Sequence, residues 1–281
     1  MATSVTGEKQ SFPGEVFNSL ATFYRRRWLL WYFVQRQVTR NYRDSYLGFV
    51  WAVLGPLIWV FFITLIFSKM LGIRDRAVTG DPDLNFGLYL YCGLLPFLAW
   101  SESLSKGINC IRASSGLVQK VIFPLELLPL SQTFTSLIDK FFGVGALIVV
   151  TFIWTGRLHW TVVLLPLLVV VQMLFILGLA YLMSFIGTYV PDVGEILRPF
   201  IRGMFFFTPI LWPTGRVPES LSFLVDLNPL AYLVKSYRAL ILYGELPNLM
   251  ASLYFTLFAV AVFIVGFVLF VRFKPYFADQ L

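Results

Sequence analysis

Long apolar runs without a charged residue constrain this chain more than any other feature. Leu249–Val271 has no charged side chain, and Trp160–Val190 has none either. About 20 mostly apolar residues are enough for a helix to cross the hydrocarbon core of a bilayer. Only 13% of the 281 residues are charged, which is about half the share in a soluble domain and too little to cover a water-facing surface of this size. We therefore expect an all-α integral membrane protein.

Six segments are candidate spans, of which Leu197–Trp212 is short. They are Tyr46–Leu71, Phe86–Leu104, Ser131–Trp154, Trp160–Val190, Leu197–Trp212 and Leu249–Val271. Between the fifth and sixth spans, residues 213–248 are too charged for a lipid-facing helix and too apolar for a free loop, so a re-entrant helical pair is expected there. The predicted organisation is a cytosolic N-terminal region, residues 1–45, followed by a transmembrane domain, residues 46–281.

The positions of Lys and Arg predict the orientation. Six spans place both termini on one side, and that side carries about twice as many Lys and Arg as the other, as cytosolic loops do. Both termini are therefore expected in the cytosol. The first 24 residues lack an apolar h-region, so no cleaved signal peptide is expected. The net charge of +7 is explained by this topology and predicts no nucleic-acid partner.

Residues 16–43 lack Pro and Gly and predict an amphipathic helix in the membrane interface before the first span. At about 100° per residue, Arg36, Arg40 and Arg43 lie opposite the apolar side. Arg27 falls on the apolar side, so we expect a bend near the arginine triplet. The helix either anchors the first span and holds membrane lipids, which is the simpler interpretation, or presents its guanidinium groups to the diphosphate of a lipid carrier.

Motifs for catalysis are nearly absent. The chain has no Gly-Lys dipeptide and hence no P-loop, and His159 is its only histidine. The Asp81–Asp83 segment resembles a metal-binding Asp-x-Asp motif, but the Pro between the two carboxylates favours a turn. Asp139 and Lys140 are costly within a span. Each must face another helix, a water-filled cavity or the interface, and an interhelical contact and a transport role are equally open.

Four stretches resemble the ABC-2 type permeases of polysaccharide export, the O-antigen and teichoic acid group. They are Arg36–Leu57, the basic approach to the first span; Tyr89–Ile108, the second span; Leu117–Ser131, "LVQKVIFPLELLPLS"; and Thr208–Arg238, with Asn-Pro before an Arg. The third stretch, with its Phe-Pro and Leu-Pro pairs, is the most specific. The four follow in the family's order over most of residues 36–238.

The resemblance implies a homodimeric, multi-pass permease in the inner (cytoplasmic) membrane, joined to two cytosolic ABC ATPase subunits that bind ATP and Mg²⁺. The chain itself would be no enzyme. It would be the transmembrane subunit that moves an undecaprenyl-diphosphate-linked polysaccharide, such as O-antigen, outward. The family offers its ATPases a short helix between the second and third spans, here Ile111–Leu128. The expected contact residues are Lys120, Val121, Ile122, Phe123 and Glu126.

We expect aromatic rings along the glycan path, because sugar faces stack on rings without fixed hydrogen bonds and can slide. Trp51, Gly55, Ile58 and Phe62 form one helical stripe in the first span. In the fifth span, Phe205, Phe206 and Phe207 cover most faces of the helix. For any single ring, contact with lipid is the simpler interpretation, so the prediction concerns the set.

On the exit side, Asn228-Pro229 should break residues 213–248 into two short helices, because Pro disfavours helical geometry at the residue before it. A lid over the channel is predicted, represented by Leu224, Asn228, Pro229 and Leu233. The alternative is a plain hairpin that rests on the membrane.

Two other functions stay open. An integral membrane glycosyltransferase would need a metal-binding carboxylate pair on the cytosolic face. The candidates Asp44, Glu126, Asp192 and Glu195 show no Asp-x-Asp spacing. An ABC-2 permease for a drug or haem is opposed only by the aromatic content and by the loop after the second span. Between O-antigen and teichoic acid as the exported substrate, the sequence leaves both open.

Overall fold

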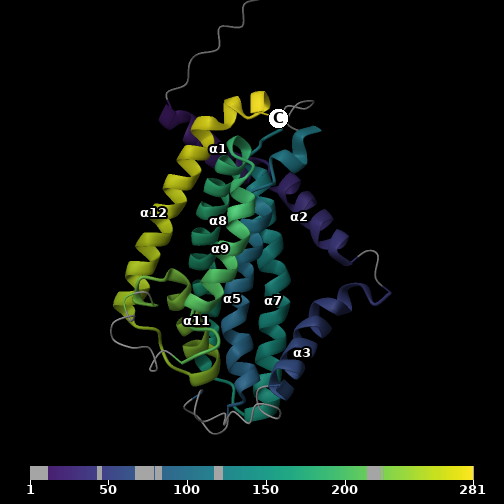
Figure 1. Ribbon diagram of the computed structural model, residues 1–281, viewed down its shortest axis with the longest axis vertical. Coiled ribbons are helices and arrows are strands. Elements are labelled where there is room, and N and C mark those ends of the chain that lie inside the picture. Colours follow the sequence, from purple (N-terminus) through teal and green to yellow (C-terminus); the bar gives the residue numbers. More distant parts are fainter. Residues whose placement is uncertain are drawn as a thin grey trace, which may run out of the picture.

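The computed structural model describes residues 12–42, 46–66, 79, 84–116, 123–213, 223 and 225–280, and every regular element in these ranges is a helix (Figure 1). The α-helices are α1 (Phe12–Arg25), α2 (Arg27–Tyr42), α3 (Trp51–Thr64), α5 (Phe86–Gly107), α7 (Leu127–Thr155), α8 (Leu165–Tyr189), α9 (Val193–Phe207), α11 (Pro229–Arg238) and α12 (Leu249–Phe273). Shorter turns are η1 (Gly48–Val50), η3 (Arg112–Ser114), η4 (Trp160–Leu164), η6 (Ala239–Tyr243), η7 (Lys274–Tyr276) and η8 (Ala278–Gln280). The all-α prediction is confirmed for the described part of the chain.

Among the described residues, three helical segments have the length and apolar composition to cross a membrane: Leu127–Thr155, Trp160–Tyr189 and Leu249–Tyr276. Helix α5 has 22 residues, but α3 has 14 and α9 has 15. At 1.5 Å per residue, helices of this length reach about 21–23 Å, less than the hydrocarbon core of about 30 Å. The arrangement of six spans with a re-entrant pair therefore stays a prediction.

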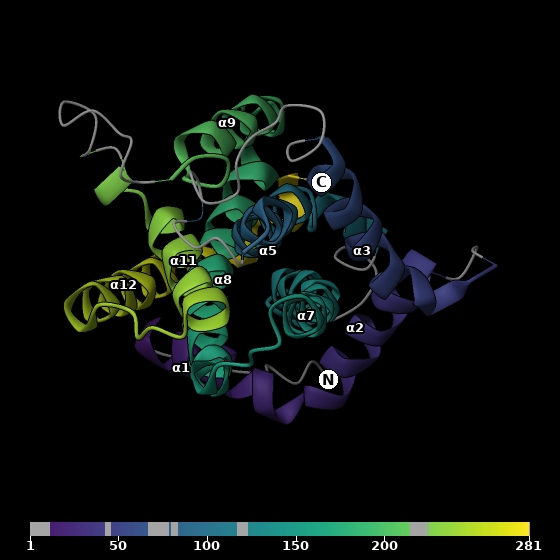
Figure 2. The ribbon, with the colours of Figure 1, turned by 90° about the horizontal axis from the view of Figure 1, so that it is seen from below.

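Helix α5 is central in the bundle. It packs against α3, α7, α8, α9 and α11, and Figure 2 shows it among these helices, with α12 farther out. Every residue of α5 from Phe86 to Phe97 is buried. A helix that is buried all round needs neighbours on all sides, so the first half of α5 is the core of this fold.

Two glycines let α8 and α12 pack closely along one another. A Cβ added at Gly178 would lie 2.5 Å from the Cα of Phe263, and one added at Gly266 would collide with the carbonyl oxygen of Gly178. Small residues at helix contacts allow the close backbone approach on which helix association in lipid depends. A larger side chain at either position would push the two helices apart.

The two ends of the bundle differ. Helices α1 and α2 lie at the same end as the C-terminal end of α12, and α11 lies at the opposite end (Figure 1). The helix expected over residues 16–43 is a pair of helices, and the break falls at Arg26, inside the arginine triplet. Helix α1 packs against α12, and α2 packs against α7. Of the two, α2 is thus fixed beside the start of α7, where Gln37 contacts Ser131.

Side chains and a glycine define several helix ends. Asn85 Oδ1 accepts a hydrogen bond from the Gly87 amide at 2.7 Å and caps α5. Asn228 Oδ1 accepts one from the Leu230 amide at 2.9 Å, at the start of α11. Gly156, with φ of 67°, ends α7 in the left-handed conformation that glycine favours. The break predicted at Asn228-Pro229 therefore coincides with the start of α11.

Candidate functional site

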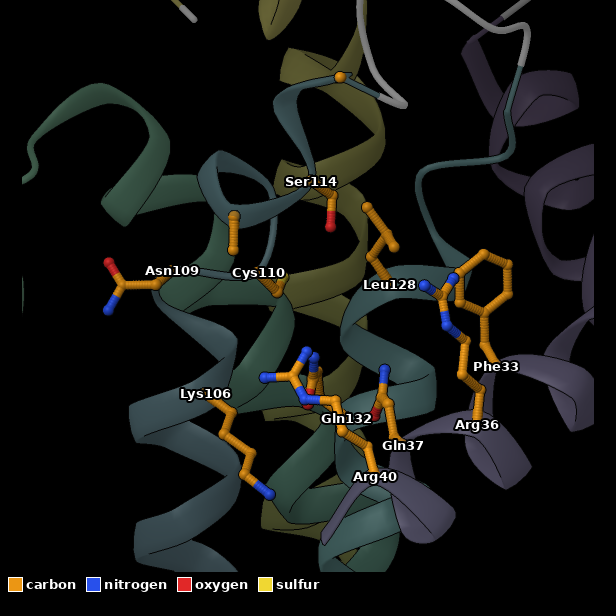
Figure 3. A pocket seen from close by; sticks show the side chains of 12 residues that line it. Phe33, Arg36, Gln37, Arg40, Lys106, Asn109, Cys110, Ser114, Leu128 and Gln132 are labelled. Atoms are coloured by element: carbon orange, nitrogen blue, oxygen red, sulfur yellow. The ribbon is translucent and has the colours of Figure 1, made fainter. Parts of the chain in front are cut away.

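A cavity of about 680 Å³ lies between α2, the C-terminal end of α5, the turn after α5 and the first turns of α7 (Figure 3). We call it the basic cavity. Its described lining residues are Phe33, Arg36, Gln37, Arg40, Lys106, Asn109, Cys110, Ala113, Ser114, Gly116, Leu128 and Gln132. Among these residues three are basic, several carry amide or hydroxyl groups, and none is acidic. Such a lining suits an anion that accepts hydrogen bonds.

The basic side chains come from two walls of this cavity. In Figure 3, Arg40 extends from α2 toward α5, which carries Lys106, whereas Arg36 lies beside Phe33. Arg36 and Arg40 also line a neighbouring hollow of about 520 Å³ on α2. Both arginines are exposed, so their guanidinium groups are open to a ligand. Arg43, the third predicted contact, lies outside the described residues.

Gln37 fixes α2 against α7. Its amide nitrogen donates to Ser131 Oγ at 3.2 Å, and its amide oxygen accepts from Thr135 Oγ1 at 3.0 Å. Because the amide uses a donor and an acceptor at once, it sets the rotation of α2 and the direction in which Arg36 and Arg40 project. These partners lie 94 and 98 residues away in sequence, so no local pattern marks Gln37.

A single carboxylate next to the basic cavity holds two lysines. Lys106 Nζ lies 2.5 Å from Glu102 Oε1, and Lys140 Nζ lies 2.7 Å from Glu102 Oε2. The first pair lies within α5, and the second joins α5 to α7. Lys140 therefore makes the interhelical polar contact that was one of the two interpretations of its place in a span.

A smaller cavity of about 220 Å³ lies between α3, α5 and α7. We call it the tryptophan cavity, and it is lined by Trp51, Gly55, Trp59, Tyr91, Leu94, Leu95, Leu98, Asp139, Lys140 and Gly143. It includes Trp51 of the predicted glycan path. Trp59 was not among the predicted path residues, although Trp51, Gly55 and Trp59 repeat every four residues, which places them near one face of a helix.

The other predicted path residues lie elsewhere. The exposed ones are Ile58, Phe62, Phe206 and Phe207. Phe205 packs edge-to-face on Phe97 of α5, with 5.6 Å between the ring centroids. The structure thus brings one predicted ring to a cavity and places the others on surfaces or in a helix contact. The path as a set stays a prediction.

The predicted ATPase contact is described only at its C-terminal end, and Lys120, Val121 and Ile122 lie outside the described residues. The Phe123 ring packs edge-to-face on the ring of Phe33, with 5.2 Å between the ring centroids. Phe33 lines the basic cavity. Glu126 is buried, with 2% of its surface exposed, and its carboxylate accepts from Lys274 Nζ at 2.7 Å. The Glu126 side chain therefore points inward to the C-terminal turn, and its contact with an ATPase stays a prediction.

Arg238 docks α11 onto the rest of the bundle. It is buried, with 4% exposed, and donates to the carbonyl oxygens of Tyr89 at 3.2 Å, Pro209 at 2.7 Å and Ile210 at 2.8 Å. Its guanidinium carbon lies 3.5 Å from the centroid of the Tyr89 ring, a cation–π geometry. No role of Arg238 could be predicted from the sequence, since its partners come from α5 and from the turn after α9.

The predicted lid residues fall in and before α11. Leu224 lies outside the described residues, Asn228 and Pro229 begin the helix, and Leu233 is fully buried. Asn228 Nδ2 donates to Thr208 Oγ1 at 3.1 Å, which joins the start of α11 to the end of α9. The movement of α11 as a lid stays a prediction.

Apolar helices that can cross a bilayer, together with a cavity at one end whose described charged lining residues are all basic, are typical of a membrane permease. The chain matches the ABC-2 type transporter family over residues 29–242. This is more than half of the chain, and the chain belongs to this family. The family resemblance noted in the sequence is therefore confirmed.

Named relatives agree with this assignment. The chain is 31% identical over 227 residues to the O-antigen export system permease protein RfbA of Myxococcus xanthus, which covers 80% of this chain and 84% of that protein. It is 27% identical over 244 residues to RfbA of Klebsiella pneumoniae, covering 86% and 90%. It is 23% identical over 239 residues to the polysialic acid transport protein KpsM of Escherichia coli, covering 84% and 89%.

Proposed function

We propose that this chain is the transmembrane subunit of an ABC exporter that moves an undecaprenyl-diphosphate-linked polysaccharide outward across the inner membrane. The observation that carries the proposal is the basic cavity, with Arg36, Arg40 and Lys106 on its walls and no acidic residue among the described lining. The relatives are named for export of O-antigen and transport of polysialic acid, and both substrates are polysaccharides.

The basic cavity would bind the diphosphate of the carrier. Guanidinium groups pair with phosphate oxygens through two parallel hydrogen bonds, and an ammonium adds a point charge. The cavity volume of about 680 Å³ falls within the usual range for small-ligand sites, about 300–1,000 Å³. Helix α2 lies at the bundle's edge (Figure 2), so a lipid tail could stay in the bilayer while its headgroup enters the cavity.

The assembly around this site is part of the proposal. Two copies of the chain, each with six spans and cytosolic termini, would form the permease, and two ABC ATPase subunits with ATP and Mg²⁺ would drive it. The basic N-terminal helices would then face the cytosol, where a lipid-linked glycan is assembled. The chain itself would hydrolyse nothing.

The test is export by variants of the arginine pair in cells that depend on this permease. R36Q/R40Q should lower surface polysaccharide about tenfold or more, whereas R36K/R40K should retain part of it, because lysine keeps the charge but loses the bidentate fork. R25Q/R202Q is the matched control, since Arg25 and Arg202 are exposed residues of α1 and α9 away from the cavity. Equal export by R36Q/R40Q and wild type, at equal membrane abundance, would refute the proposal.

A further inference from the structure

The face of α5 that lines the basic cavity continues into the tryptophan cavity. Lys106 borders the first cavity, and Leu98, Leu94 and Tyr91 border the second. These positions follow one another at intervals of three, four or eight residues, so they share one side of the helix. Glu102 stands between the two sets, one turn from Lys106 and one turn from Leu98. The two cavities therefore lie along the same face of α5, and the carboxylate of Glu102 lies between them.

Glu102 uses both of its oxygens on lysines that belong to different cavities. Oε1 is bound by Lys106 of the basic cavity at 2.5 Å, and Oε2 by Lys140 of the tryptophan cavity at 2.7 Å. The side chains of the three residues remain 24–34% exposed. These part-buried pairs are still open to water, so an ionic ligand can reach the charged groups and compete for them.

We propose that Glu102 is an internal counter-anion, which a phosphate-bearing ligand displaces from the two lysines in turn. The inference rests on the proposed function, because it concerns how the same diphosphate leaves the basic cavity. Phosphate oxygens would replace Oε1 on Lys106 first, and then Oε2 on Lys140. An ammonium has three N–H donors and no acceptor, so the exchange alters hydrogen bonds and breaks no covalent bond.

In this proposal the Glu102 carboxylate weakens the binding of the diphosphate enough for it to be released. Arg36, Arg40, Lys106 and Lys140 would otherwise form a cationic group that holds a diphosphate too tightly to release it. Glu102 competes for both lysines, lowers the affinity, and neutralises the lysines once the ligand has passed. Asp139 also lines the tryptophan cavity beside Lys140. The tryptophan cavity therefore attracts an anion less strongly than the basic cavity does.

The test is equilibrium binding to the full chain in lipid nanodiscs, with undecaprenyl diphosphate and inorganic pyrophosphate as separate probes. In E102Q both probes should bind about three- to tenfold more tightly, because the competing ion pairs are worth a factor of this order. Export should nevertheless fall in E102Q, since release and transfer are impaired. E195Q is the matched control: it removes the carboxylate of the exposed Glu195–Arg198 pair on α9, and binding should be unchanged.

Two further variants keep the inference falsifiable. E102Q leaves two lysines close together, so E102Q/K140Q is included to remove their repulsion while leaving Lys106 unpaired; its binding should still tighten. Unchanged or weaker binding in a folded E102Q or E102Q/K140Q would overturn the counter-anion. If undecaprenyl diphosphate bound more tightly but inorganic pyrophosphate did not, the change would concern the lipid tail and not the diphosphate. This result would also overturn the counter-anion.

The experiments distinguish a failure of the counter-anion from a failure of the proposed function. If R36Q/R40Q weakens binding but E102Q does not tighten it, the counter-anion is wrong and the diphosphate site stands. If R36Q/R40Q leaves binding of both probes unchanged, the diphosphate site itself is wrong, and the counter-anion falls with it.

Discussion

Replacing Arg238 by Met should detach α11 from the bundle. The side chain keeps its apolar stem but loses its donors, which leaves the carbonyls of Tyr89, Pro209 and Ile210 without their guanidinium partner. A buried group that loses its hydrogen bond costs about 1–3 kcal/mol. Three carbonyls lose their donor together, so three such losses near the lower end of this range add to about 3–5 kcal/mol. At about 2–4 °C per kcal/mol, Tm should fall by about 6–20 °C.

The assay is thermal unfolding of the purified protein in detergent, followed by tryptophan fluorescence. K235M is the matched control, because Lys235 lies on the same helix, is exposed and stands 3.9 Å from Asp226; its Tm should stay within about 2 °C of wild type. R238K should fall between the two, since one ammonium cannot reach all three carbonyls. A Tm for R238M equal to that of K235M would refute the docking role.

The substitution G93A tests the docking role of Arg238 independently, because the direction of its effect on Tm depends on whether Arg238 lies against Gly93. A Cβ at this position would lie 2.7 Å from Arg238 Nη2, so G93A should displace the guanidinium and lower Tm. The same Cβ would lie 3.1 Å from Val234 Cγ1, so two side chains of α11 would have to give way. If α11 were not docked at this place, G93A would instead stabilise the protein by up to about 1 kcal/mol, because Ala has a higher helix propensity than Gly. A rise in Tm would therefore contradict the argument.

Three further predictions follow from the described contacts. K274Q should lower the stability by about 1–3 kcal/mol, because Glu126 is left buried without its partner; E126Q/K274Q should recover most of the loss in Tm, and no recovery would contradict the ion pair. Q37L should cost about 1–2 kcal/mol and weaken diphosphate binding, since two hydrogen bonds that orient α2 are lost; unchanged binding would leave Gln37 without a positioning role. In a background without native cysteines, L227C should react with a membrane-impermeant thiol reagent at rest and L233C should not, because these side chains are 78% and 0% exposed. Labelling of L233C should rise during ATP turnover, and constant labelling would contradict the lid.

The helices formed by the two long uncharged runs could be predicted closely from the sequence. The uncharged run expected at Trp160–Val190 is η4 followed by α8, which ends at Tyr189, and the run expected at Leu249–Val271 is α12, which ends at Phe273. In lipid a segment must satisfy its backbone hydrogen bonds internally, so length and apolarity are sufficient to predict such helices. The arginine triplet likewise marked the break between α1 and α2, because a charge on the apolar side cannot stay buried.

The contacts of the candidate site could not be predicted in this way. Whether Lys140 reaches Glu102 depends on how α5 and α7 are rotated and shifted against one another, and the two residues are 38 apart in sequence. The partners of Arg238 are backbone carbonyls, which have no sequence signature. A pattern of apolar residues predicts which segments enter the membrane, but helix packing decides which polar groups meet there.

The segment between α5 and α7 is connected to the basic cavity on both of its sides. Before residues 117–122, Ser114 and Gly116 line the cavity. After these residues, the ring of Phe123 rests on Phe33, which lines the cavity from α2. If the ATPases act on residues 117–122, as the family resemblance implies, a displacement there reaches two walls of the cavity directly, without passing through the buried half of α5. In the proposed exporter, a movement of the predicted coupling segment by the ATPase would therefore change the distances between the groups that would hold the headgroup.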